Sequence, residues 1–190
     1  MAHKPNSARG DWAKQVRFDM QFAEKTLLKN GDVGRMFVIH AKDAQHAMLA
    51  PWNSREEKFR MLQMVRAYCI AVDAVAVSFI SEAWVRSVMR AHGESEAEFH
   101  ERSEAVRPSE AEDRREVVMC VVMYREAGER HVLSEAREIQ RRANGKPDGL
   151  TPYRQLETLD VVGGDVIGVF PKYPPTPEMR AMARMALGIQ

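Results

Sequence analysis

The stretch Glu116–Glu126, EVVMCVVMYRE, decides the fold. Its residues are apolar at both alternating sets of positions, which is typical of a strand in the middle of a sheet that is covered on both faces. Ala127-Gly128-Glu129 can turn the chain, and Arg130–Ile139 (RHVLSEAREI) returns with a more polar alternation. The two segments therefore predict an antiparallel hairpin.

Other β-prone segments lie on either side of this hairpin. Residues 73–87 (DAVAVSFISEAWVRS) alternate between larger and smaller side chains, and residues 158–170 contain two short β-prone runs separated by Gly163-Gly164. The stretch Lys42–Trp52 is ambiguous between a loop and a second short strand. We expect a mostly antiparallel sheet built from residues 35–41, 75–84, 116–126, 130–139 and 159–170.

Three segments carry the apolar spacing of amphipathic helices. The first begins at Asp11, a typical N-cap residue, and ends before Gly31. The second begins at Ser54, which has the spacing of a capping box with Glu57, and the third begins at Thr176-Pro177. We expect helices over 11–30 and 54–71 to cover one face of the sheet, with the third as a C-terminal helical appendage.

Length and composition indicate a single α+β domain. The chain has 190 residues, of which 45% are hydrophobic and 29% charged, as in ordinary globular proteins. We expect a flexible arm at residues 1–10, the α+β domain at 11–171, and a proline-rich spacer with an amphipathic helix at 172–190. Residues 92–116 carry nine acidic side chains against four basic ones and are expected to form an exposed connection.

The charge balance and the cysteines restrict the class of protein. Lys and Arg number 28 against 27 Asp and Glu, a formal net charge of +1, which excludes a broadly basic nucleic-acid-binding surface. The first residues contain no apolar core of a signal peptide, and no run approaches the ~18 apolar residues of a membrane helix. Cys69 and Cys120 form no CxxC pair. We therefore expect a cytoplasmic protein with buried free thiols and no membrane partner.

Sequence signatures of cofactor or metal chemistry are absent. The glycine-rich stretch Gly163–Gly168 lacks the Lys and Ser or Thr that a P-loop places after its last glycine. The sequence has no HExxH, no GxSxG and no zinc-binding pair of cysteines. A zinc site made by His40, His46 and either Glu82 or Glu135 has no spacing that supports it. We predict no cofactor and no metal.

Two carboxylates support an alternative function as a small hydrolase-like enzyme. Glu82 and Glu135 lie in strand segments among apolar neighbours, and burial without a partner raises the pKa of a carboxyl group enough for acid–base work. One of His40 and His131 would complete such a site. The competing interpretation, which we favour, places both carboxylates in solvent or in ion pairs with nearby arginines.

A weaker alternative is a nucleic-acid-associated protein. Arg137, Arg141 and Arg142 gather in and after the return strand of the hairpin and offer phosphate contacts. No helix-turn-helix, zinc-finger or aromatic RNA-binding pattern accompanies them, and a solvated basic face is the favoured interpretation.

Methionine is abundant, with 12 residues, and flexible thioethers suit adaptable contact surfaces. The C-terminal helix has an apolar stripe that requires a cover, either the body of the same chain or a second protein. Its residues are Met179, Met182, Ala183, Ala186 and Leu187. The preferred hypothesis is a non-catalytic protein-binding or assembly module that forms a homo-oligomer or binds another protein.

The middle third of the chain resembles small uncharacterised bacterial and phage-type proteins. The resemblance covers about residues 73–124 and is carried by AVAVSFISEAWV (74–85), Arg107-Pro108-Ser109-Glu110, and Asp113–Val118 leading into a strand. It implies no activity and no catalytic residue. It implies that the two flanking segments are neighbouring strands with an exposed loop between them.

Overall fold

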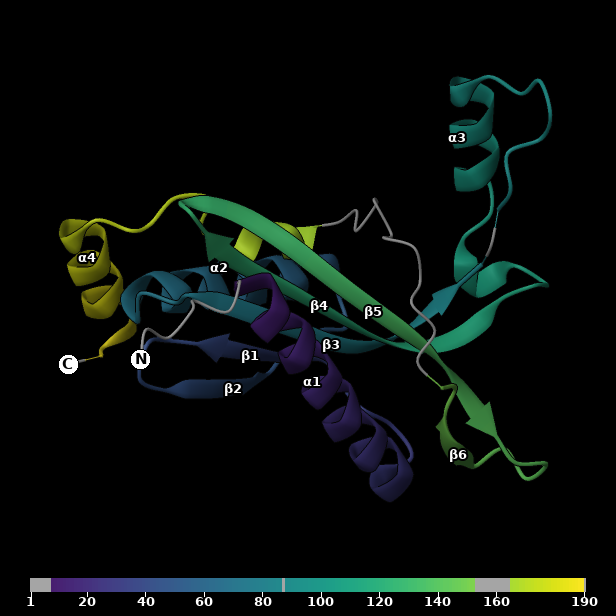
Figure 1. The fold of residues 1–190 in the computed structure, drawn as a ribbon, viewed down its shortest axis with the longest axis horizontal. Helices are drawn as coiled ribbons and strands as arrows, with labels where there is room; N and C mark the ends of the chain where they lie inside the picture. The colour runs from purple at the N-terminus through teal and green to yellow at the C-terminus, as the bar shows by residue number, and fades with distance from the viewer. Residues whose placement is uncertain (1–7, 87, 153–164, 190) are drawn as a thin grey trace, which may run out of the picture.

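Six strands form one antiparallel sheet in the computed structural model, which describes residues 8–86, 88–152 and 165–189 (Figure 1). The order across the sheet is β2-β1-β3-β4-β5-β6. The strands are β1 (Met36–His40), β2 (Gln45–Leu49), β3 (Ala76–Val85), β4 (Arg115–Glu126), β5 (Glu129–Arg141) and β6 (Pro147–Leu150). The predicted α+β class and the antiparallel sheet are confirmed.

Strands β4 and β5 form the antiparallel hairpin that the sequence predicts, with ten residue pairs in register. Glu126 lies opposite Glu129, so the turn contains only Ala127 and Gly128, with φ of 51° and 86°. A two-residue turn of this kind needs positive φ at both positions, because only then does its twist match that of the strands. Gly128 adopts this conformation freely, whereas Ala127 does so at a cost of about 1 kcal/mol.

The helices of the body lie on opposite faces of the sheet. They are α1 (Ala8–Asn30) and α2 (Arg55–Ala71). In the first core, Met20 and Leu27 of α1 pack with Ile80 and Val118 of the sheet. In the second core, on the other face, Val65 of α2 packs with residues of the sheet, namely Phe37, Val77, Phe79 and Met123. Our expectation that both helices cover one face is therefore corrected. The reason is that β3 and β4 carry large apolar side chains on both faces, and each face needs a cover.

Helix boundaries follow the capping residues in part. Ser54 caps α2 as predicted, because its Oγ accepts the Glu57 amide at 3.1 Å. Helix α1 begins at Ala8, before the predicted cap Asp11, so residues 8–10 of the expected arm are helical. Residues 1–7 lie outside the described part of the chain.

The predicted strand at 159–170 is wrong where it is described. Residues 153–164 lie outside the described residues, and Asp165–Val169 form the 3-10 helix η2 instead of a strand. Val169 and Phe170 are buried in the α2 core, and the Arg66 guanidinium donates to the Gly168 carbonyl at 2.9 Å. The segment thus fills the core under α2 and does not extend the sheet; the sixth strand is β6, from the loop predicted after β5.

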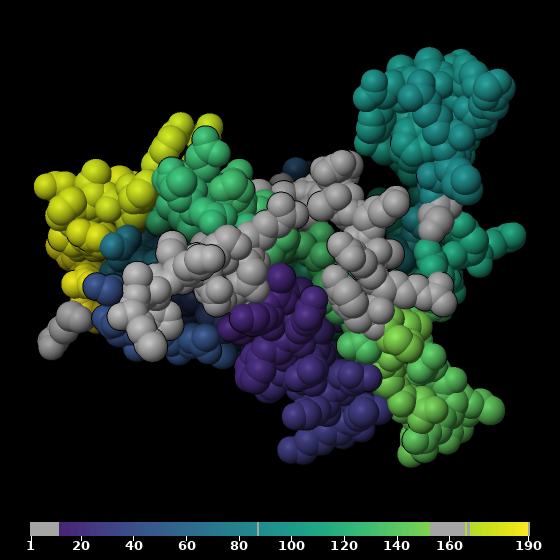
Figure 2. Space-filling model, viewed as in Figure 1, coloured from purple at the N-terminus to yellow at the C-terminus, as the bar shows by residue number. Residues whose placement is uncertain are grey.

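A projecting arm connects β3 to β4, in agreement with the expected exposed connection. It carries α3 (Glu96–Glu104) and the 3-10 helix η1 (Pro108–Glu110), and Figure 2 shows α3 standing away from the body. Ser95 and Glu98 form a capping box at its first turn, and Arg102 binds Glu94 through two hydrogen bonds of 2.7 and 2.8 Å. Local polar bonds therefore hold this helix, since it has no buried residue.

The C-terminal helix α4 (Pro177–Leu187) packs against α2 of the same chain. Arg180 pairs with Asp73, and Arg184 Nε donates to the Ala71 carbonyl at 2.9 Å. Gly188 ends the helix in the left-handed conformation, at φ 65°. The predicted C-terminal helix is confirmed, and it meets its own chain through polar bonds.

Two neighbouring leucines of α1 test the burial of this face. Leu27 is fully buried, whereas Leu28 is 51% exposed. We expect Leu27→Ala to lower the free energy of unfolding by about 2–5 kcal/mol, because it leaves a cavity, and Leu28→Ala to change it by less than about 1 kcal/mol. Urea denaturation of both variants measures this difference. Equal losses would show that α1 does not pack as described.

Candidate functional site

The four candidate catalytic residues share the α1 face of the sheet but stay apart. His40 lies in register with Ala76, which pairs with Tyr124, which pairs with His131. The two histidines are thus three strands apart, roughly 14 Å between Cα atoms. His131 stacks on the Tyr124 ring, with centroids 5.3 Å apart. The sheet therefore does not bring the two histidines together.

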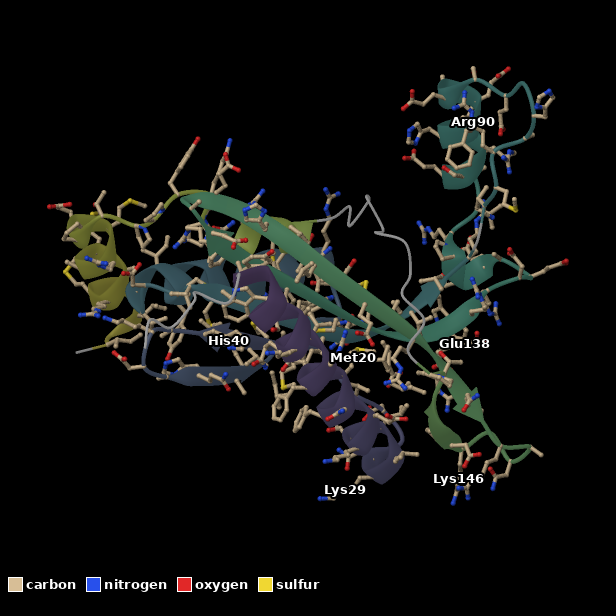
Figure 3. The ribbon with its side chains drawn as sticks, viewed as in Figure 1. Met20, Lys29, His40, Arg90, Glu138 and Lys146 are labelled. Atoms are coloured by element: carbon tan, nitrogen blue, oxygen red, sulfur yellow. The ribbon has the colours of Figure 1, made fainter. Side chains whose placement is uncertain are left out.

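His40 is part of a buried polar chain beneath α1; Figure 3 labels His40 of β1 and Met20 of α1. Gln45 Nε2 lies 3.1 Å from His40 Nδ1, and His40 Nε2 lies 3.2 Å from Ser78 Oγ. An amide nitrogen only donates, so Nδ1 accepts and the imidazole proton sits on Nε2, which donates to Ser78. The Ser78 hydroxyl is left to donate to Asp19, whose pKa this hydrogen bond lowers.

This Ser–His–Asp group has the composition of a hydrolytic triad, but its hydrogen bonds run in the opposite direction. In a triad the serine donates to the histidine, which acts as its base; here the histidine donates to the serine. Burial lowers the pKa of His40 to about 4, so it does not take up a proton at neutral pH. Ser78 is fully buried, which keeps it from a substrate. The group fixes α1 on the sheet.

Asp19 and Glu135 are buried carboxylates on the same face. Burial raises the pKa of Asp19, partly offset by hydrogen bonds with Ser78 and Gln15, whose Nε2 lies 2.8 Å from Oδ1. Asp19 Oδ2 has no partner among the described residues. Burial also raises the pKa of Glu135, while the charges of Arg137 and Arg17 lower it. These groups keep their protons more readily than exposed carboxylates, and no described hydrogen bond joins either one to a histidine.

Glu82 has a structural partner of its own. Its Oε1 accepts the Val33 amide at 2.7 Å and so holds the loop between α1 and β1 against β3. Burial raises the pKa of Glu82, the Val33 amide lowers it, and nearby Glu116 and Asp32 raise it further. Glu82 faces Val118 and Glu135 faces Cys120 in β4, so the two carboxylates lie on different strands with β4 between them.

The three arginines of the nucleic-acid alternative are engaged within the chain. Arg137 Nε donates to the Thr151 carbonyl. Arg141 holds both oxygens of Glu116, at 2.7 and 2.8 Å, and Arg142 pairs with Asp148 at 2.7 Å. These bonds hold β6 and the turn between β5 and β6 in place; Figure 3 labels Lys146 of this turn. Phosphate would have to displace these bonds.

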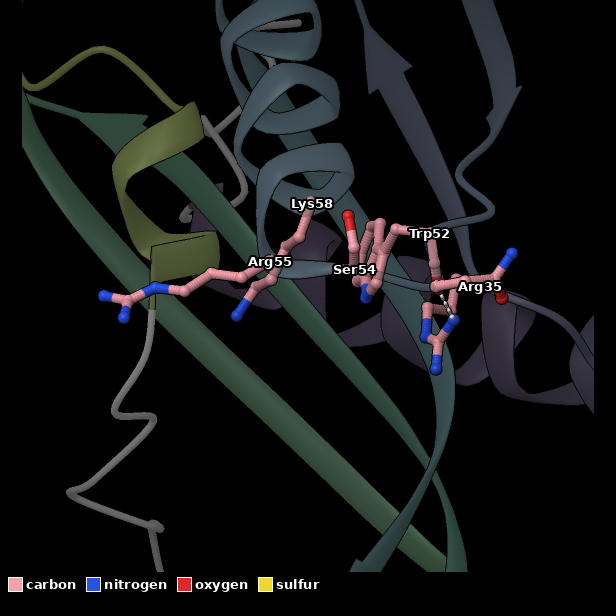
Figure 4. A pocket seen from close by; sticks show the side chains of 6 residues that line it. Arg35, Trp52, Ser54, Arg55 and Lys58 are labelled. Carbon is pink, nitrogen blue, oxygen red and sulfur yellow. Dashed lines mark hydrogen bonds between the residues drawn. The ribbon is translucent and has the colours of Figure 1, made fainter.

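An open pocket lies at the start of α2 (Figure 4). Its volume is about 690 Å³, and it is lined by Arg35, Trp52, Asn53, Ser54, Arg55 and Lys58. The Arg35 guanidinium lies over the Trp52 ring at 5.0 Å and donates to the Trp52 carbonyl at 3.0 Å. The lining offers cations and hydrogen-bond donors, but it pairs no nucleophile with a base.

The other candidate is the strand β2, which ends the sheet on one side in the described part of the chain; we call this side the β2 edge. Ala41 donates to Ala44 and Ala50 donates to Arg35, at 2.9 and 2.8 Å, on either side of the β1–β2 pairing. Bonded and non-bonded pairs alternate in an antiparallel ladder, so the backbone groups of Gln45, Ala47 and Leu49 point away from β1. The β2 edge consists of these backbone groups and the side chains of the same three residues, all exposed and uncharged.

Helix α2 adds an apolar row on the side of β2. Tyr68 marks that side of the helix, because its hydroxyl bonds to His46 Nδ1 of β2 at 3.1 Å. Met64 and Met61 lie four and seven residues before Tyr68 and share its row. Met64 is exposed, while Met61 and Tyr68 are half-buried. On the β2 side of the molecule, α2 therefore presents apolar side chains, and β2 presents backbone groups that can form hydrogen bonds.

Sequence reasoning located this side of the molecule only as an ambiguous segment. The alternation of His46 and Met48 with Ala47 and Leu49 was the available signal for β2, and five residues are too few for it to exclude a loop. In the predicted stripe of α4, Ala183 and Leu187 are half-buried, whereas Met179, Met182 and Ala186 are exposed. The partner-binding role of that stripe stays a prediction.

Comparisons with known proteins place the chain in no family. No family model matches the sequence, and neither a curated protein nor a solved structure matches it. Within the described residues, no group of three His, Cys, Asp or Glu side chains is arranged to hold a metal ion. No helix in that part of the chain has the length and apolar character to cross a bilayer.

The buried His40 predicts a specific pH dependence of stability. Its pKa is about 4 when folded, below the ordinary value of 6.5, so between these values only the unfolded chain takes up the proton. We expect this group to remove about 3 kcal/mol from the free energy of unfolding as pH falls from 7 to 4. Asp19 and Glu135, with raised pKa values, act in the opposite direction.

Comparison of variants isolates the histidine. The difference in unfolding free energy between wild type and His40→Gln should change with pH across this window, measured by urea denaturation at each pH. His100→Gln, at an exposed position of α3, should follow the wild-type curve. Parallel curves for wild type and His40→Gln would contradict the assigned burial.

Proposed function

We propose that the protein is a non-catalytic assembly module that associates with itself in the cytoplasm, and that the β2 edge is its contact surface. One observation carries the proposal: the sheet ends in a strand without the usual protections. Natural edge strands are blunted by charged side chains, proline or bulges. The residues of β2 (QHAML) include neither a charge nor a proline, and β2 pairs with β1 without a bulge.

The opposite edge of the same sheet supports this interpretation. Strand β6 (PDGL) contains Pro147 and Asp148, and its pairing with β5 is irregular at Gln140 and Arg141. Glu24 of α1 accepts the Leu150 amide at 2.9 Å and covers this edge. Within the described residues, one edge is thus blocked by several devices, whereas the other is left open. This difference between the edges is what we expect of a protein that pairs with another strand at β2 and avoids such pairing at β6.

The alternatives have less support from the geometry. The carboxylates and histidines of the hydrolase-like alternative are separated or tied to structural partners. The arginines of the nucleic-acid alternative hold carboxylates and carbonyls of their own chain. A competing hypothesis is that the module binds a different protein and not a second copy of itself. In that hypothesis the exposed methionines of α4 form the contact surface.

Matched substitutions on the two surfaces test the proposal. Leu49 is 71% exposed and Met182 of α4 is 67% exposed, so glutamate at either position leaves the fold intact. We expect wild type to form a dimer at micromolar concentration and Leu49→Glu to weaken it at least about tenfold, because each copy buries the added charge. Met182→Glu should change the dissociation constant by less than about twofold.

Sedimentation over a range of concentrations measures both effects. A wild-type chain that is monomeric throughout the micromolar range would overturn self-association. Dissociation by Met182→Glu and not by Leu49→Glu would move the contact surface to α4.

A further inference from the structure

We propose that β2 pairs with β2 of a second copy, antiparallel and in a single register centred on Ala47, so that two sheets become one continuous sheet. This inference rests on the proposed function and specifies the geometry of its contact. It follows from the backbone groups that β1 leaves unused, together with the symmetry that two identical edges impose.

The outward backbone groups select the register. Residues 45, 47 and 49 point away from β1, and in an antiparallel pair only such residues exchange both of their hydrogen bonds. When Ala47 faces Ala47 of the second copy, Gln45 faces Leu49 and Leu49 faces Gln45. All three outward residues of each strand are then paired, which gives roughly six hydrogen bonds.

Shifted registers lose bonds. A shift by two residues in one direction places Gln45 opposite Pro51, which has no backbone N–H to donate. A shift in the other direction places Leu49 opposite Asp43, in the turn between β1 and β2. The centred register is thus the one that uses the whole strand.

A two-fold axis through Ala47 makes the contact self-complementary. Each copy presents the same surface to the other, as in the closed dimers that are commonest among oligomers. The small Ala47 side chain faces its own copy, and the facing pairs contain no charge, so no like charges meet. On the other face of the sheet, the apolar rows of Met61, Met64 and Tyr68 from the two α2 helices lie on either side of the axis.

Single cysteines distinguish this register from any other contact. Directly opposed residues of a bonded pair have Cα atoms about 5.5 Å apart, within the range of a disulfide. We expect Ala47→Cys to form a disulfide-linked dimer under mild oxidation. Gln45→Cys and Leu49→Cys alone should stay unlinked, since like residues are roughly 13 Å apart in this register, whereas a mixture of these two variants should cross-link.

Two further variants keep the test independent of the cysteines. Ala47→Pro removes an N–H that points away from β1, so the fold persists while the dissociation constant rises at least about tenfold. Ala47→Ser retains the N–H and should leave the dimer unchanged. The native cysteines, Cys69 and Cys120, are buried, so wild type provides the unlinked control.

The outcomes separate the two proposals. A dimer in sedimentation whose Ala47→Cys variant does not cross-link, or in which Leu49→Cys alone links, overturns the register and leaves self-association standing. A strict monomer overturns both. Cross-linking of Ala47→Cys and of the mixed pair, with loss of the dimer in Ala47→Pro, supports the continuous sheet.

Discussion

The structure depends on the need to cover both faces of β3 and β4. Their side chains alternate between two apolar surfaces, with Ile80 and Val118 on one and Val77 and Phe79 on the other. Neither surface is stable in water, because roughly 25 cal/mol is lost for each Å² of apolar area left exposed. Helix α1 covers the first surface, and α2 with the buried end of η2 covers the second. The thiols of Cys69 and Cys120 are enclosed by these layers, and burial raises the pKa of Cys69 to about 12.

Polar groups inside the α1 layer orient the helix. An apolar interface tolerates sliding, whereas Asp19, Ser78 and His40 make directional bonds that exist in one position of the helix only. Glu24 and Glu82 act in the same way at the far end, where they hold the Leu150 and Val33 amides. Residues of the types found in catalytic sites thus fix the position of α1 on the sheet.

The sequence predicted what local periodicity determines. The hairpin at β4–β5, the two body helices and the strand at β3 all carry long, regular patterns. Periodicity shows which side of a helix is apolar and leaves open which face of the sheet it meets, so the placement of α1 and α2 on opposite faces was missed. Strand β6 and the partners of Arg137 and Arg141 depend on residues distant in sequence, such as Glu24 and Glu116. Strand β2 stayed ambiguous between a loop and a short strand because five residues carry too little pattern, and the openness of its edge is a property of the assembled sheet.

The arm between β3 and β4 leaves the body at the pair formed by Val85 and Arg115, and beside this pair η1 and Arg114 contact β3. Strand β1 pairs with β3 only as far as Ile80, and β5 pairs with β4 only from Val117 onward. At Trp84 and Val85 the base of the arm is therefore a two-stranded ribbon of β3 and β4. Closing a longer loop at such a base costs only about 0.6 kcal/mol for each doubling of its length. The tip near Arg90 is therefore a natural point of insertion, where a foreign domain or a fluorescent label can be grafted without disturbing either core.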